Sequence, residues 1–205
     1  AASDAPGGPC AADDALAAAH CGLGAAHADL GELRAAEASL RAATLFHDGR
    51  AEAAPPQVFY NLGNVQLRLH QLEDAAHAYR SALKAAAWQE TRAGAAAGGA
   101  GVSSLYPAAR TNLGHVLREL ASRALLRSDV ATAARCWREA AEVWMRRYGE
   151  SDMQVRDMAR AAADADELVA TLQAQAQDGA RKAAASKETA LGQRVAHVQG
   201  LAAAA

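Results

Sequence analysis

The stretch that decides the fold is residues 55–84, PPQVFYNLGNVQLRLHQLEDAAHAYRSALK. Its small and large apolar residues recur at the spacing of two consecutive helices joined by a short turn. The residues that set this spacing are Asn61, Leu62 and Gly63 in the first half, and Ala75, Tyr79 and Ala82 in the second. The stretch therefore predicts a helical hairpin.

The same pattern occurs once on each side of this stretch. The upstream copy consists of Leu23, Gly24, Ala36, Leu40 and Ala43, with Gly31 at the turn. The downstream copy has Leu117, Leu120, Ala121 and Ala124 in its first helix, Ser128, Asp129 and Val130 at its turn, and Ala133, Trp137 and Ala140 in its second helix. A further Asn-Leu-Gly begins at Asn112, ahead of Leu120, so we expect the first helix of this copy to be about two turns longer.

These three copies resemble the tetratricopeptide repeat family, whose members are stacks of helical hairpins. The resemblance covers about residues 11–148, and the middle copy matches best. It implies an all-α fold, namely an α-solenoid of about three tetratricopeptide-like helix hairpins followed by a C-terminal capping helix. Because such repeats mostly bind proteins rather than catalyse, the resemblance also implies an interaction module.

The chain is expected to hold one domain between two flanking segments. Residues 1–10 are predicted to be an extended N-terminal segment, residues 11–177 the helical repeat domain, and residues 178–205 a polar linker with a short C-terminal helix. A Gly/Ala-rich insertion at about 91–104 interrupts the domain. Its glycines favour flexibility, so the insertion is either a solvated linker or a segment held by contact with another chain.

The expected capping helix begins after Ser151, which together with Gln154 fits a capping box. Its apolar residues recur at helical spacing: Met153, Val155, Met158, Ala162, Ala165, Leu168, Val169 and Leu172. The opposite face is charged and would shield the end of the stack from water. The methionine-containing stripe either packs on the repeats or binds a partner.

A candidate binding surface follows from the first helices of the hairpins. Asn61 and Asn112 both precede Leu-Gly, and they resemble the asparagines that line the groove of peptide-binding members of the family. An amide both donates and accepts, so it can pair with a peptide backbone whatever the peptide's side chains are. Gln57, Asn64 and His115 would extend this surface. Helix-capping or solvent-facing roles are the alternative for all of these polar residues.

Composition and charge exclude several classes of function. The formal net charge is −2 with acidic and basic residues interspersed, which argues against nucleic-acid binding. No apolar run approaches the roughly 20 residues needed to span a bilayer, so any membrane attachment would be peripheral. Cys10, Cys21 and Cys136 show neither disulfide nor zinc spacing, which predicts a reducing, intracellular compartment. That compartment is cytoplasmic, or organellar if the missing first methionine reflects a cleaved targeting peptide.

The sequence also lacks the motifs of catalysis. No phosphate-binding glycine loop, nucleophile elbow or metal-binding helix motif is present, so we expect no enzyme activity, no cofactor and no metal. The favoured interpretation is a structural or accessory subunit of a multiprotein assembly, whose thin alanine core gains stability from its partners. The alternative is an adaptor that binds an extended peptide through Asn61 and Asn112.

Overall fold

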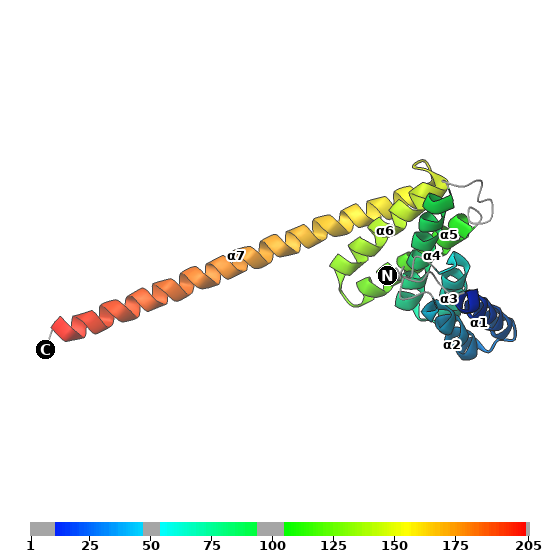
Figure 1. The fold of residues 1–205 in the computed structure, drawn as a ribbon. Coiled ribbons are helices and arrows are strands. Elements are labelled where there is room, and N and C mark those ends of the chain that lie inside the picture. Colours follow the sequence, from blue (N-terminus) through cyan, green and yellow to red (C-terminus); the bar gives the residue numbers. More distant parts are fainter. Residues whose placement is uncertain (1–10, 47–53, 94–104, 204–205) are drawn as a thin grey trace, which may run out of the picture.

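Helices make up every regular element in residues 11–46, 54–93 and 105–203, the parts of the chain that the computed structural model describes. The described helices are α1 (Ala11–Asp29), α2 (Leu33–Leu45), α3 (Pro56–Arg68), α4 (Leu72–Ala93), α5 (Leu105–Leu126), α6 (Val130–Tyr148) and α7 (Met153–Ala203). Each helix packs chiefly on its neighbours in sequence, and α7 extends far beyond the stack (Figure 1). The fold is thus an all-α helical solenoid, as the sequence predicts.

Three hairpins, α1–α2, α3–α4 and α5–α6, are closed by turns of the same geometry. Gly31, His70 and Ser128 occupy the middle of these turns with φ values of 81°, 59° and 60°. In every turn, the next residue donates its N–H to the carbonyl five residues earlier, at 2.9 Å. This is a Schellman turn, in which a left-handed residue ends the first helix. The three hairpins therefore share one turn geometry.

The stack has two rows of helices. The first helices α1, α3 and α5 contact one another and form what we call the first-helix row. The second helices α2, α4 and α6 form the second-helix row, and each one also packs on the first helix of the next hairpin or, for α6, on α7. Every hairpin is therefore held by its own two helices and by the adjacent hairpin.

Glycine allows the close approach of the two helices in each hairpin. A Cβ atom added at Gly24 would lie 2.6 Å from Cγ of Leu40, and one added at Gly63 would lie 2.8 Å from Cε1 of Tyr79. The small residues of the repeat pattern lie in the same buried layers, with Ala36, Ala75, Ala82, Ala133 and Ala140 all buried. Close packing around small residues is therefore what holds each hairpin together.

The third hairpin differs from its prediction. A Cβ added at Gly114 would lie 1.8 Å from Nε1 of Trp144, so Trp144 occupies the position that Tyr79 has in the second hairpin. The predicted aromatic, Trp137, is only partly buried and lies nearer the turn, beside Ala121. Compared with the second hairpin, both helices of this hairpin are longer between the glycine–aromatic contact and the turn. The sequence pattern predicted a longer first helix alone.

Leu23 also differs from its predicted role in helix packing. Its equivalent in the second hairpin, Leu62, is buried in a cluster with Leu40 of α2, and the equivalent in the third, Leu113, is buried with Tyr79 of α4. Leu23 is 49% exposed. The reason is its place in the stack, because no described helix precedes α1.

The C-terminal part of the chain is one continuous helix. The sequence predicted a linker after residue 177, but α7 runs without a break from Met153 to Ala203, over 51 residues. Alanine is the strongest helix former, and the segment contains no proline, so local preference favours helix even where polar residues are frequent. The first part of α7 packs on α6, in the place predicted for the capping helix.

Aspartate side chains cap the N-termini of α6 and α7. Asp129 accepts a bond from the N–H of Thr132 at 3.0 Å, and its hydrogen bonds to Thr132 lower the pKa of the Asp129 carboxyl. At the start of α7 the cap is Asp152 rather than the predicted Ser151, since its Oδ1 accepts from the N–H of Gln154 at 2.8 Å. Both carboxylates satisfy N–H groups that the helix itself leaves without partners.

Two predicted features lie outside the described residues. They are the extended segment 1–10 and most of the insertion at 91–104, of which only 91–93 are seen, as the last residues of α4. None of the described helices combines the length and the apolar character that a membrane span requires.

Candidate functional site

A hydrogen-bonded group of three side chains joins the second hairpin to the third. The Tyr79 hydroxyl donates to Oδ1 of Asn64 at 2.7 Å, and Nδ2 of Asn112 donates to the same oxygen at 3.1 Å. Nδ2 of Asn112 also lies 3.4 Å from the Tyr79 oxygen. Burial raises the pKa of the Tyr79 hydroxyl, so it stays protonated and acts as the donor. Asn112 therefore serves first to connect helices α3, α4 and α5.

Asn61 lies at the boundary between α1 and α3, where a depression of about 200 Å³ opens between the two helices. Its Oδ1 accepts a bond from Nε2 of Gln57 at 2.8 Å. Across the depression α1 presents small residues, Gly24, Ala25 and Ala28. At the next hairpin boundary Asn112 meets the amide of Asn64, whereas Asn61 meets the thiol of Cys21 on α1 and borders the open depression.

His115 belongs to a third environment, on the exposed side of α5. Its ring makes an edge contact with Trp144 at 5.1 Å between centroids, and the Arg118 guanidinium lies 5.8 Å from the same indole ring. Burial, and secondarily the charge of Arg118, lower the pKa of His115. The five predicted residues thus lie on α3 and α5, but they form separate groups rather than one continuous row of amides.

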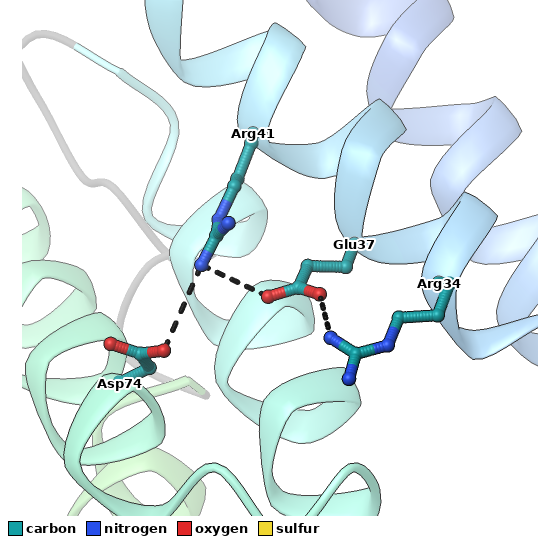
Figure 2. Close-up of polar contacts among 4 residues, drawn as sticks. All are labelled: Arg34, Glu37, Arg41 and Asp74. Atoms are coloured by element: carbon teal, nitrogen blue, oxygen red, sulfur yellow. Dashed lines mark hydrogen bonds and ion pairs between the residues drawn. The ribbon is translucent and has the colours of Figure 1, made fainter.

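Ion pairs join the successive hairpins along the second-helix row. Figure 2 shows Glu37 of α2 between Arg34 and Arg41, at 3.2 and 3.0 Å, and Arg41 in turn reaching Asp74 of α4 at 3.7 Å. Glu37 is almost fully buried. Its charge is compatible with burial because both carboxylate oxygens have a guanidinium partner.

An ion pair also joins the helices at each of the next two boundaries of this row. Arg80 of α4 meets Glu139 of α6 through two bonds of 2.5 and 2.7 Å. Arg138 of α6 pairs with Asp166 of α7. The two pairs join α4 to α6 and α6 to α7. They could not be predicted from the sequence, because nothing in the local spacing links residues so far apart.

The apolar stripe of α7 continues past the point where α6 covers it. Val155, Ala162 and Ala165 are buried where α7 packs on α6. Leu168 and Leu172 follow on the same helix and are 46% and 49% exposed. Figure 1 shows α7 running on alone beyond the end of α6. The exposed continuation of a packed stripe is a surface for a further helix or protein.

The described residues offer little to metal or thiol chemistry. They contain no group of three or more His, Cys, Asp or Glu side chains placed to bind one metal ion. Cys21 and Cys136 are free, and burial raises the pKa of both thiols. A raised pKa lowers the thiolate fraction and hence the reactivity. These cysteines behave as small packing residues.

Comparison with known proteins finds no protein-family model that matches the chain and no significant match among curated proteins. The tetratricopeptide interpretation therefore stays a prediction. It depends on the repeated Gly and Ala positions and on the common turn geometry of the three hairpins. What the fold defines is the class, an all-α helical solenoid with an extended C-terminal helix.

Proposed function

We propose that this tetratricopeptide-like solenoid is a non-catalytic scaffold for protein-protein interaction, acting as a structural or accessory subunit of a larger assembly. The observation that carries the proposal is the exposed apolar stripe of α7 beyond α6. Leu168 and Leu172 continue the same stripe that packs on α6, so the helix presents to water a surface of the kind it buries elsewhere.

The length of α7 supports the same function. α7 has 51 residues, but the helix that it packs on, α6, has 19. Described side chains from Ala170 to Lys187 are exposed, with no other element covering them. An isolated helix is only marginally stable in water, since most helical stability in proteins comes from packing of an apolar face. A helix of this length therefore gains stability from a partner that lies along it.

The proposed partner is a protein with an amphipathic helix. Leu168 and Leu172 would pack into its apolar face, and the charged Lys182, on a flank of the same helix face, would lie at the edge of the contact. We place the assembly in a reducing, intracellular compartment, cytoplasmic or organellar, because Cys21 and Cys136 are free thiols. Attachment to a membrane complex would be peripheral.

The test is affinity purification of the full-length tagged chain from the cells that make it. The double variant Leu168→Glu/Leu172→Glu should lose the proteins that co-purify with the wild type. The matched control is Ala174→Glu/Gln177→Glu, which adds the same charge to the other side of the same helix and should retain them. Equal recovery of partners by both variants would reject the α7 stripe as the binding surface.

A second candidate function is the adaptor that binds an extended peptide through Asn61 and Asn112. The depression between α1 and α3 favours it, because Asn61 and Asn64 lie in its wall. Asn112 fits less well, since its amide hydrogens already face Asn64 and Tyr79. Asn61→Ala should weaken binding of an extended peptide without lowering stability, whereas Asn112→Ala should lower stability as well. If Asn61→Ala leaves the affinity for the partner unchanged, the groove assignment fails.

A further inference from the structure

The outward side of α1 is apolar and lies in water. We define the α1 outer face as Leu16, Ala19, Leu23 and Ala26 of α1 together with Leu30, the first residue after the helix. All five are exposed, the leucines by 47%, 49% and 75%. No Asp, Glu, Lys or Arg occurs between Ala15 and Ala28. Single exposed leucines are ordinary, but an uncharged helix face with leucine on every second turn marks an interaction surface.

The repeats themselves indicate what kind of element covers such a face. Leu62 of α3 is buried with residues of α2, and Leu113 of α5 is buried with residues of α4. In both cases a helix of the preceding hairpin supplies the cover. Leu23 holds the equivalent place on α1, and no described helix covers it. The missing cover is therefore an apolar helix that runs along α1.

The order of residues on the α1 outer face makes it complementary to itself. Leucine and alanine alternate, with Leu16, Leu23 and Leu30 in one set and Ala19 and Ala26 in the other. When two helices pack in antiparallel fashion, one set faces the other set of the partner helix, so every leucine would lie against an alanine. Alternating large and small residues in this way fills the interface and lets the helices approach closely. A parallel pair would instead oppose leucine to leucine and alanine to alanine.

We propose that two copies of this chain associate through their α1 outer faces, as an antiparallel helix pair about a two-fold axis. The contact is isologous, because each copy offers the same face to the other. Since the face carries no charged residue from Ala15 to Ala28, self-association meets little electrostatic repulsion. A single helix pair is smaller than the roughly 1,200 Å² typical of stable complexes, so the dimer should form and dissociate with concentration.

Sedimentation velocity of the full chain over a wide range of concentration tests the proposal. The wild type should pass from monomer to dimer, and Leu23→Glu should stay monomeric. Leu30→Glu should also stay monomeric. Because Leu30 is the most exposed leucine of the face, this substitution should have little effect on folding, so loss of the dimer could not be attributed to unfolding. The control Leu126→Glu changes an 88% exposed leucine at the end of α5 and should dimerise like the wild type.

The Ala26→Leu variant distinguishes the antiparallel helix pair from nonspecific hydrophobic association. The substitution enlarges the apolar surface, so a merely adhesive face would associate more strongly. In the antiparallel pair, however, the new side chain collides with a leucine of the partner, and the dissociation constant should rise by about tenfold or more. A wild type that is monomeric at every concentration overturns the proposal, as does stronger association of Ala26→Leu or an unchanged dimer in Leu23→Glu.

Discussion

Replacing Gly114 with alanine is expected to destabilise the protein, although alanine is the better helix former. Gly114 lies within α5, directly against the indole ring of Trp144. A Cβ atom at this position would lie 1.8, 2.3 and 2.4 Å from three atoms of that ring. Contacts between carbon atoms are favourable only near 3.5–4.0 Å, so the ring or the helix must move.

The surroundings of Trp144 decide the magnitude. The side chain is fully buried, and its ring contacts His115 at 5.1 Å and Tyr148 at 6.4 Å between centroids. With little room to shift, the overpacking should cost about 3 kcal/mol, the upper part of the usual range. The higher helix propensity of alanine relative to glycine offsets about 1 kcal/mol of this cost. The net loss in the free energy of unfolding is therefore about 2 kcal/mol, or about 4–8 °C in Tm for a chain of this size.

Urea titration followed by circular dichroism measures this loss, and Gly22→Ala is the matched control. Gly22 lies within α1, where an added Cβ meets nothing within 4 Å. Alanine there should raise the free energy of unfolding by about 0.5–1 kcal/mol through helix propensity alone. The two identical substitutions thus have opposite expected signs.

Equal stabilisation by Gly114→Ala and Gly22→Ala would refute the claim that glycine at this level is required by the indole ring. A double-mutant cycle sharpens the test. Trp144→Phe shortens the side chain, so adding Gly114→Ala to it should cost less than adding the same substitution to the wild type. Additive effects would mean that the two positions do not meet.

Three further outcomes are expected. Tyr79→Phe removes a buried hydroxyl that donates to Asn64, and should lower the free energy of unfolding by about 1–2 kcal/mol in urea titrations. Burial lowers the pKa of His115 below 6.5, so the unfolded chain binds the proton more tightly than the folded protein does. The free energy of unfolding should therefore fall as the pH drops below 6.5. His115→Gln should reduce this loss of stability, as measured by urea titrations at two pH values. A double-mutant cycle with Arg80→Gln and Glu139→Gln should give a coupling of about 0.5 kcal/mol, smaller in high salt because both side chains are partly exposed.

The first two hairpins were open to prediction because their signal is local. Gly24 with Leu40 and Gly63 with Tyr79 have the same separation in the chain, and one short turn brings each pair together. The high alanine content predicted the all-α class for the same reason, since helix propensity acts within a few residues. Both inferences needed no knowledge of neighbouring hairpins.

The third hairpin shows where local spacing fails. Trp137 and Trp144 lie on one side of α6, and each has a small residue opposite it on α5, Ala121 or Gly114. The turn at Ser128 is compatible with either Trp137 or Trp144 as the aromatic residue of the repeat pattern. The level that aligns with the second hairpin is set by the contact of Asn112 with Asn64 and Tyr79, a contact between hairpins that no pattern within one hairpin contains.

The candidate site was predictable only as a set of residue types. The sequence placed amides on the first helices of two hairpins, but it could not show that Asn112 bonds to Asn64 while Asn61 borders a depression. Those outcomes depend on the residue opposite each amide on the neighbouring helix. The same reason hid the ion pair of Arg80 with Glu139, which joins helices of different hairpins.

The two ends of the solenoid differ in the surface that they present, and the difference bears on how assembly stops. At one end α7 covers α6 and exposes charged residues such as Arg156, Asp157 and Glu167. At the other end α1 exposes leucine and alanine, the kind of surface that the repeats use to stack. Head-to-tail stacking onto α1 would need a matching apolar surface at that end of the stack, and the outer face of the part of α7 that covers α6 does not offer one. An isologous contact consumes both open ends at once, so it yields a closed particle rather than a growing filament.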